Sequence, residues 1–208
     1  MNTIRFRISG ECIMLQNVQT ANPRNKYAKR LKQLTADKKR KTADVDAILD
    51  EIADVEVESC LYFNEELGLH IPAANIRAAL IDGAKLSKLG RDIDRYCVVG
   101  GDAKLVYPGP QTIQGIVEDP DCRYDAMVKV GMSMVPKSRA IFRNWSADIE
   151  ILYMADNKMD ARAIKKCMTD AGLFCGIGAS RRIGFGRFDC VEIDEKGHII
   201  DDVQAAAK

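Results

Sequence analysis

A glycine-rich segment near the C-terminal end of the chain places the strongest constraint on its fold. Residues 176–188 read GIGASRRIGFGRF, with four glycines, three arginines and two phenylalanines in thirteen positions. Glycine tolerates positive φ and close approach of another backbone, and arginine carries forked donors that match phosphate oxygens. The segment predicts a backbone corner whose arginines and free amides form one ridge facing a polyanion. A plain glycine corner with solvated arginines is the alternative interpretation.

The segment lies between a helix pattern and a strand pattern. Asp160 is the expected N-cap of the helix, Gly172 its expected end, and residues 187–193 predict the strand. The apolar face of the helix consists of Ala163, Ile164, Cys167, Met168 and Ala171. Dinucleotide-binding loops have the opposite order, strand before helix, and a P-loop needs Gly-Lys-Ser/Thr. Both of these nucleotide sites are therefore excluded.

Alternating and helical patterns along the rest of the chain predict the fold class. Alternation over Thr3–Ile8 predicts a strand, with residues 12–15 as its hairpin partner across Ser9-Gly10. Pro72 opens a helix with an apolar stripe made of Ile76, Ala79, Leu80, Gly83 and Ala84. Further strands are expected on either side of Gly100-Gly101 between Tyr96 and Tyr107, over residues 126–134 and over residues 147–154.

This order predicts an α+β protein with a ferredoxin-like (RRM-like) antiparallel sheet, two packing helices, a helical insertion after the first strands and extra hairpins. We expect a single domain over residues 1–208. The insertion covers residues 22–58, with helices near 27–34 and 45–52, and Thr42 as the N-cap of the second. Its first half is basic up to Lys41 and its second half is acidic from Asp44.

Composition limits the chemistry of the chain. Its seven cysteines include no Cys-x-x-Cys pair, and it has only two histidines, so we expect neither a disulfide framework nor a metal site, and no cofactor. Asp119, Asp121 and Asp125 fit a plain acidic turn better than a calcium loop. No apolar run approaches the roughly 20 residues that span a bilayer, so we expect a cytoplasmic protein without a membrane partner.

Two segments resemble the RAMP superfamily of CRISPR-associated proteins. Residues 176–187 fit the family's loop, Gly-x-Gly-x-x-Arg-x-x-Gly-Phe-Gly-Arg, between the last helix and last strand of a ferredoxin-like domain. Residues 70–80, HIPAANIRAAL, are similar to the Ile-Pro-Gly-Ser-Ser-Leu-Lys-Gly-Ala-Leu-Arg segment that opens the first helix of effector backbone subunits. In that segment Ala73 and Ala74 replace Gly and Ser, Asn75 replaces a serine, and Arg77 takes the place of the lysine.

The resemblance implies a non-catalytic subunit that binds single-stranded guide RNA, or single-stranded DNA, through its sugar–phosphate chain without reading sequence. Such subunits form homo-oligomers along the strand or assemble with other effector subunits, and insert a thumb between flipped nucleotides. The expected nucleic-acid-binding residues are Gly176, Gly178, Ser180, Arg181, Arg182, Gly184, Phe185, Gly186, Arg187, Asn75, Arg77, Lys38, Lys39, Arg40, Lys41, Arg139 and Arg143. Arg5 and Arg7 are further basic candidates, and Phe142, Trp145 and Phe185 are candidate stacking surfaces. For Trp145 a core position is the favoured interpretation.

Two other functions remain open. The charge-split insertion also suits a RAMP-like assembly or inhibitor protein that acts through protein contacts. A metal-independent endoribonuclease would need a general base such as His70, for which an ordinary exposed histidine is the simpler interpretation. Some RAMP relatives cut RNA with an aspartate before Asn-Pro, but here Ala21 precedes Asn22 and Pro23.

Overall fold

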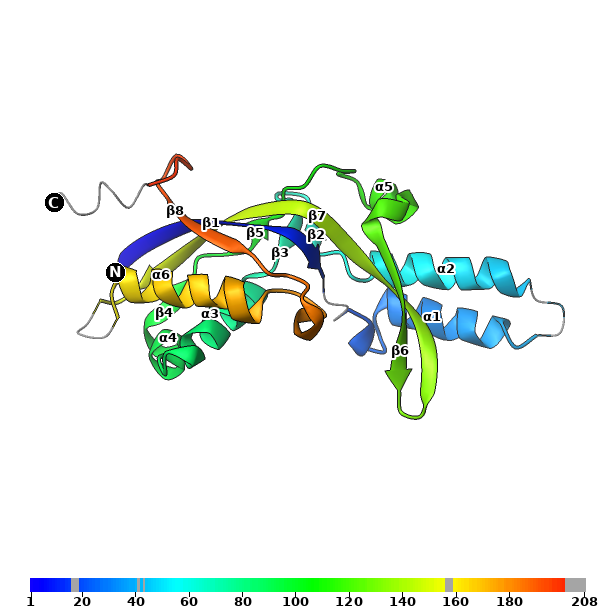
Figure 1. Ribbon diagram of the computed structural model, residues 1–208. Coiled ribbons are helices and arrows are strands. Elements are labelled where there is room, and N and C mark those ends of the chain that lie inside the picture. Colours follow the sequence, from blue (N-terminus) through cyan, green and yellow to red (C-terminus); the bar gives the residue numbers. More distant parts are fainter. Residues whose placement is uncertain (16–18, 41, 43, 156–158, 201–208) are drawn as a thin grey trace. The chain divides into compact units, whose positions relative to one another are not determined.

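The computed structural model describes residues 1–15, 19–40, 42, 44–155 and 159–200 (Figure 1). The chain forms two compact units, each described by itself. The first contains residues 1–13, 64–108 and 143 onward, and the second contains residues 14–63 and 109–142. The expectation of a single RAMP-like domain stays a prediction.

The sheet of the first unit has the ferredoxin-like strand order. From edge to edge it runs β4 (Cys97–Val99), β7 (Ser133–Tyr153), β1 (Asn2–Met14) and β8 (Asp189–Ile193). β8 pairs antiparallel with β1, and β4 pairs antiparallel with β7. β7 lies between β1 and β4, and β1 lies between β7 and β8, so the chain builds two interlocked split βαβ units. The predicted α+β ferredoxin-like fold is confirmed.

Two helices connect the strands of these units. α3 (Ala73–Leu86) lies between β1 and β4 in the sequence and α6 (Ala161–Asp170) between β7 and β8, and the two helices pack against each other (Figure 1). A Cβ at Gly83 would lie 2.2 Å from the Cys167 carbonyl oxygen, so only glycine allows this close contact. The predicted stripe of α3 is buried throughout, which confirms it.

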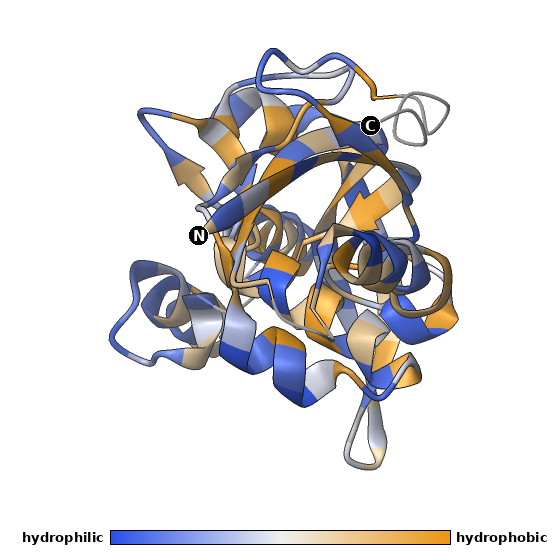
Figure 2. Ribbon diagram, turned by 90° about the vertical axis from the view of Figure 1, so that its left-hand side faces the viewer, coloured by the Kyte–Doolittle hydropathy of each residue, from blue (hydrophilic) through white to orange (hydrophobic). Residues whose placement is uncertain are grey.

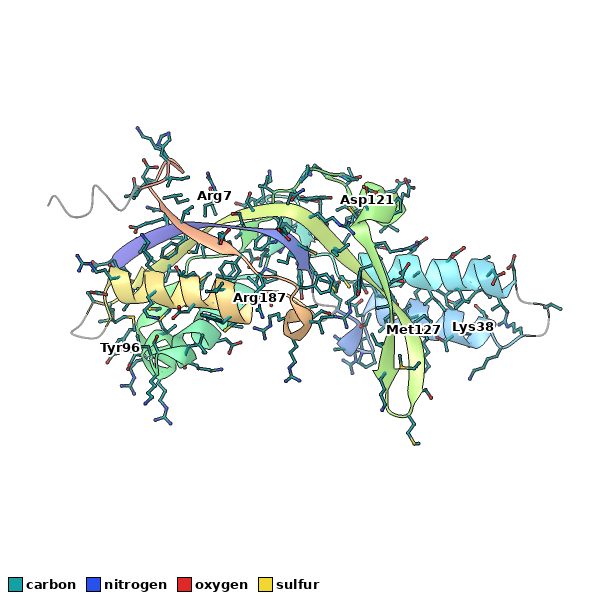
Figure 3. All side chains as sticks on the ribbon, in the orientation of Figure 1. Arg7, Lys38, Tyr96, Asp121, Met127 and Arg187 are labelled. Atoms are coloured by element: carbon teal, nitrogen blue, oxygen red, sulfur yellow. The ribbon has the colours of Figure 1, made fainter. Side chains whose placement is uncertain are left out.

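The alternation of β1 separates the core from a charged sheet face. Ile4, Phe6 and Ile8 are buried, whereas Arg5 and Arg7 point to the other face. There Arg5 donates to Glu150 at 2.8 Å, and Arg7 donates to both carboxylate oxygens of Asp148 at 2.7 Å. Figure 2 shows the alternation of hydrophilic and hydrophobic residues along the long strands, and Figure 3 labels Arg7. Both arginines thus already have carboxylate partners.

The second unit contains the helical insertion and a β-hairpin. α1 (Lys26–Asp37) and α2 (Val45–Glu58) form a helical pair, and α5 (Ile113–Glu118) and the short helix η2 (Pro120–Cys122) lead into β6 (Arg123–Val130), which pairs with the first part of β7. Glu56 of α2 is buried, pairs with Lys137 and accepts a 2.8 Å hydrogen bond from the Ser138 backbone N–H. This carboxylate therefore anchors α2 to the hairpin.

Short elements complete the chain. β3 (Gly68–Ile71) pairs with β5 (Ala103–Lys104), and β2 (Phe63–Asn64) joins them in a small sheet. α4 (Gly90–Tyr96) packs on α3, the wide helical turn η3 (Ala171–Cys175) extends α6, and η4 (Arg181–Ile183) lies within the glycine-rich loop. Within the described part of the chain, no helix has the length and apolar character needed to cross a bilayer.

Four expectations about local structure are wrong. β1 is continuous through Ser9-Gly10, because Ser9 pairs with Asp189 of β8 and leaves no hairpin there. Asp44, whose carboxylate accepts from the Ala47 N–H, caps α2 in place of Thr42. Residues 126–134 contain the turn between β6 and β7, and the helical path after α6 continues past Gly172 to Cys175.

We expect Gly83→Ala to lower the free energy of unfolding by about 1–3 kcal/mol, because the added methyl group must push α3 and α6 apart. Urea unfolding followed by circular dichroism measures the change. Helix propensity alone predicts the opposite sign, a gain of about 1 kcal/mol. Ala78→Gly, at an exposed position of the same helix, is the control and should lose about 1 kcal/mol. A stabilised Gly83→Ala variant would contradict the packing argument.

Candidate nucleic-acid interface

The glycine-rich loop, residues 176–188, is held by its own backbone hydrogen bonds. The Gly176 N–H donates to the Ala171 carbonyl at 2.7 Å, and the Ile177 N–H donates to the Gly186 carbonyl at 2.8 Å. The Gly186 N–H in turn donates to the Cys12 carbonyl of β1 at 2.9 Å. These bonds fix the loop between the end of the last helix and the central part of the sheet.

The four loop glycines allow the backbone conformation of the loop, but they do not offer unpaired N–H groups to a ligand. Gly176, Gly178, Gly184 and Gly186 all have positive φ, as the sequence predicts. At Gly186 a Cβ would lie 1.8 Å from the Ile177 carbonyl oxygen, so no side chain fits there. The expectation of free amides is wrong for Gly176, Gly184 and Gly186, because their N–H groups donate to Ala171, Arg181 and Cys12. Anion binding at this loop must therefore rely mainly on side chains.

The three loop arginines line one small cavity. Arg181, Arg182 and Arg187, here called the arginine cluster, surround about 240 Å³ together with Asp82, Phe174 and Cys175. Arg182 is exposed, and Arg181 and Arg187 are partly buried. The buried Nη1 of Arg187 has no hydrogen-bond partner among the described residues. An unsatisfied buried donor costs about 1–3 kcal/mol, more when charged, so the Arg187 guanidinium keeps hydrogen-bonding capacity that the described residues do not use.

Asp82 of α3 holds the cluster in place. One carboxylate oxygen accepts from Arg181 Nη1 at 2.9 Å, and the other accepts from Lys85 Nζ at 2.7 Å. Burial raises the pKa of Asp82, but the hydrogen bonds from Lys85 and Arg181 outweigh it and leave the pKa below its ordinary value. One carboxylate thus separates two cations that would otherwise repel each other.

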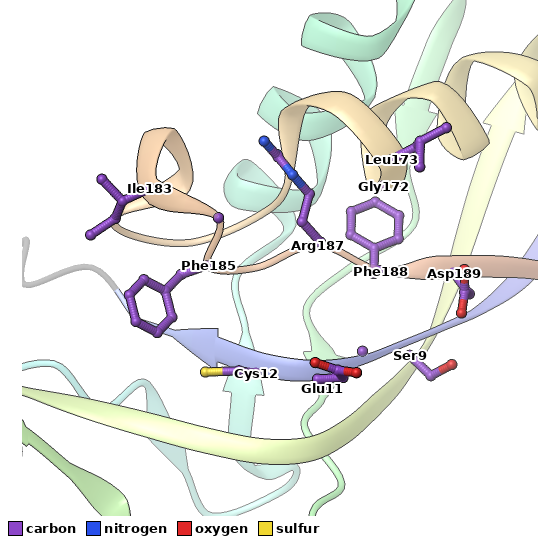
Figure 4. A pocket seen from close by; sticks show the side chains of 12 residues that line it. Ser9, Glu11, Cys12, Gly172, Leu173, Ile183, Phe185, Arg187, Phe188 and Asp189 are labelled. Atoms are coloured by element: carbon purple, nitrogen blue, oxygen red, sulfur yellow. The ribbon is translucent and has the colours of Figure 1, made fainter.

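A second cavity, of about 470 Å³, lies between the loop and β1 (Figure 4). The Phe185 ring lies beside Cys12 of β1, and the Arg187 side chain points away from β1. Leu173 and Ile183 on its rim are 63% and 71% exposed. Its remaining lining residues are Ser9, Gly10, Glu11, Gly172, Gly184, Phe188 and Asp189. The carboxylates of Glu11 and Asp189 line this cavity together with Leu173, Ile183 and two phenylalanines, so it suits a base or an apolar group better than a phosphate.

Thiol pKa values report which charges lie near these cavities. Burial raises the pKa of the Cys12 thiol, and the positive charge of Arg143 partly offsets this, so Arg143 lies near the second cavity. Burial also raises the pKa of Cys175, which lies within the field of Asp82, Arg187 and Arg181.

The first turns of α3 carry the two predicted residues of the other motif. Asn75 is partly buried, and its Nδ2 has no hydrogen-bond partner among the described residues. Arg77 is exposed and forms an ion pair with Asp94 of α4. Asp82, which binds Arg181, follows on the same helix, so α3 connects this motif with the loop.

The predicted residues of the insertion and of the hairpin belong to the second unit. Lys38, labelled in Figure 3, and Lys39 are exposed just after α1, and Arg40 pairs with Asp37 at 3.0 Å. Lys41 lies outside the described residues. Arg139 lies on β7 opposite Tyr124 of β6.

Ser180 is the remaining predicted residue of the glycine-rich loop in the first unit. Its backbone adopts a left-handed conformation, with φ 55°.

Two of the three candidate stacking surfaces are buried, which makes the candidate role of Phe142 wrong. Phe142 and Trp145 are 0% and 1% exposed, and the indole packs edge-on against Phe188 at 6.4 Å. A ring enclosed in the core cannot stack on a base without unfolding, so the core interpretation of Trp145 is confirmed. Phe185 is the aromatic candidate that keeps some exposure.

The expectation of an exposed His70 is also wrong. Its side chain is 9% exposed, Nδ1 lies 3.0 Å from the Gly68 carbonyl, and Nε2 lies 3.5 Å from Asp102. Asp119 caps the short helix before β6, consistent with a plain acidic turn. Within the described ranges no group of histidine, cysteine and carboxylate side chains could hold a metal ion.

Comparison with known proteins identifies the fold. No protein-family model matches the chain, and no curated protein matches it in sequence. Its structure is similar to a chain in the cryo-EM structure of the Type III-B Cmr-beta bound to cognate target RNA, with a TM-score of 0.52 and 13% identity. The match covers 90% of this chain and 58% of the other. At this identity the likeness shows the fold.

We expect the Asp82 ion pairs to contribute stability that disappears in acid. Because the folded pKa is lowered, this contribution is fully present above the ordinary value of 3.8 and is lost as pH falls through the folded pKa. The difference in unfolding free energy between the wild type and Asp82→Asn should be constant above about pH 5 and shrink at lower pH. Urea titrations across this range measure it.

The control is the same comparison in an Arg181→Ala/Lys85→Ala background, where the two hydrogen bonds to Asp82 are gone. In that background the remaining effect of burial raises the pKa of Asp82, so the loss of its contribution in acid should no longer be seen and the pH dependence should change sign. If the difference still shrinks in acid as it does in the wild-type background, other groups titrate and the assignment to the Asp82 ion pairs is wrong.

Proposed function

We propose that this chain is a non-catalytic, RAMP-like subunit that binds single-stranded RNA without reading its sequence. The observation that carries the proposal is the arginine cluster, three guanidinium groups around one cavity, with a buried Arg187 donor that lacks a partner among the described residues. Forked guanidinium donors match phosphate oxygens, and phosphate contacts carry no sequence information. The strand's backbone is therefore the ligand that this cavity fits.

The fold and the two RAMP-like segments support the same proposal. The similar chain belongs to a structure of the Type III-B Cmr-beta bound to cognate target RNA. The glycine-rich loop lies between the last helix and last strand, as the resemblance implies, and Pro72 precedes the first residue of α3. We extend the proposal to a guide RNA as the natural strand, to further copies or other effector subunits as partners, and to a cytoplasmic location. Phosphate chemistry accepts single-stranded DNA equally.

The non-catalytic part of the proposal rests on the surroundings of the candidate general base. His70 is enclosed and contacts Gly68 and Asp102, so it cannot readily reach a 2′-hydroxyl. The stretch Ala21-Asn22-Pro23 lacks the acid that cleaving relatives carry before Asn-Pro. A cleavage assay with the wild type and His70→Ala tests this: RNA cleavage that is abolished in the variant would contradict it.

Removing Arg181 and Arg182 should weaken RNA binding about equally for every sequence. Fluorescence anisotropy with labelled oligouridine and oligoadenosine, between about 50 and 200 mM salt, measures the affinity and its salt dependence. For single strands the slope of log K against log salt should fall in magnitude by about 0.7 for each phosphate that Arg181→Ala/Arg182→Ala no longer neutralises.

The control is Lys104→Ala/Lys196→Ala, which removes two exposed lysines from other elements of the same unit. It changes the net charge by the same amount and should keep most of the affinity. Equal effects of the two double variants, or an absence of salt-sensitive binding by the wild type, would refute the proposed role of the loop.

A second candidate function is an assembly or inhibitor protein that acts through protein contacts. The observation that favours it is the apolar surface beside the loop, where Leu173, Phe174 and Ile183 are 63%, 60% and 71% exposed. Size-exclusion chromatography before and after nuclease treatment separates the two functions. An RNA-dependent assembly dissociates on treatment, whereas a protein oligomer persists and should dissociate in a Leu173→Asp/Ile183→Asp variant.

A further inference from the structure

A third cavity lies at the corner between α3 and α4. It has a volume of about 660 Å³ and is lined by Ile81, Lys85, Lys88, Gly90, Arg91 and Asp94. Three of the side chains around it are cationic and one is acidic, although the chain as a whole has a formal net charge of only +1. The local excess of positive charge is therefore a property of this corner.

The acids near this corner do not neutralise all of its cations. Asp94 is paired with Arg77, and Asp82 binds Lys85 at 2.7 Å. Lys88 is exposed, as is Arg91, and neither has a carboxylate partner among the described residues. Asp92 in the first turn of α4 is a further acid beside Arg91, so Lys88 and Arg91 still leave an excess of one exposed positive charge that can attract an anion.

The backbone at Lys88 is unusual for a lysine. Lys88 has φ 61°, in the left-handed region that ends many helices and that glycine usually occupies. A residue with a Cβ in this region costs roughly 1–2 kcal/mol. The strained backbone places a lysine, and not a glycine, at the edge of the cavity. A glycine at position 88 would therefore relieve the backbone strain, but it would also remove the positive charge.

One carboxylate links this corner to the arginine cluster. Asp82 accepts from Lys85, which lines the corner cavity, and from Arg181, which lines the loop cavity. Asp82 therefore contacts one lining residue of each cavity. Lys85 in turn lines the corner cavity together with Lys88 and Arg91, so this contact connects the two groups of cations.

We propose that the α3–α4 corner is a second phosphate-binding subsite, occupied by backbone phosphates of the same single strand that the arginine cluster binds. This inference rests on the proposed function. It adds a path for the bound strand, which would run from the glycine-rich loop across the C-terminal end of α3. Asp82 acts as a positioning residue, because it holds Arg181 and Lys85 at the facing edges of the two subsites. Lys88 and Arg91 supply the charge that contacts phosphate.

The variant Lys88→Gly separates charge from stability. It removes one cation and also replaces a strained residue with the one that the backbone prefers, so thermal unfolding should occur at the same or a higher temperature. Binding of labelled oligouridine should nevertheless weaken. For Lys88→Gly/Arg91→Ala we expect roughly a 3-fold to 10-fold loss of affinity at about 50 mM salt, and a salt slope smaller by about 0.7 for each phosphate that is no longer neutralised.

The control variant is again Lys104→Ala/Lys196→Ala, which removes the same charge elsewhere. If Lys88→Gly/Arg91→Ala binds oligouridine like this control while Arg181→Ala/Arg182→Ala does not, the corner inference is overturned and the proposed function stands. If the wild type shows no salt-sensitive binding, both are overturned. A corner that binds a phosphoserine peptide through Lys88 and Arg91, with no effect of these residues on oligouridine, also overturns the inference.

Discussion

The arrangement of the glycine-rich loop depends on the peptide groups of Gly186, which are held from two sides. Its N–H donates to Cys12 of β1, and its carbonyl accepts from Ile177 at the start of the same loop. A side chain at this position would overlap the Ile177 carbonyl. The loop therefore closes on itself and on the sheet at one point, and the arginines before and after that point are directed to one cavity.

Some of the cations near the loop and α3 form ion pairs, and others have no acidic partner. Asp82 lies between Arg181 and Lys85, Asp94 pairs with Arg77, and each pair exposed to solvent contributes below about 1 kcal/mol to stability. Their main effect is geometric, because a paired guanidinium or ammonium group samples fewer positions. Arg182, Lys88 and Arg91 are exposed and have no carboxylate partner within the described ranges, so an incoming phosphate displaces only water and counterions from them.

What the sequence could predict follows from the range of the interactions involved. The stripe from Ile76 to Ala84 and the positive φ values of the loop glycines are local properties, set by spacing and by the absence of a Cβ, and both are found. The contact between Asp82 and Arg181 joins residues 99 positions apart, and no local pattern marks it. For the same reason Ser9-Gly10 resembles a turn in isolation, although Ser9 pairs with β8 as part of a strand.

The burial of Phe142 could not be predicted from local patterns either, because the strands next to β7 decide which of its faces is covered. The roles of the predicted binding residues stay predictions.

The ion pairs on the outer face of β1 have a consequence for how a strand would approach. Arg5 and Arg7 are each matched by a carboxylate of β7, so the field above that face is close to balanced. Arg5 has Glu195 as a second acidic partner, so these two arginines offer a polyanion little uncompensated positive charge. If the proposed function holds, the ionic-strength dependence of association would arise at the unpaired cations of the loop and of α3 and not at Arg5 and Arg7.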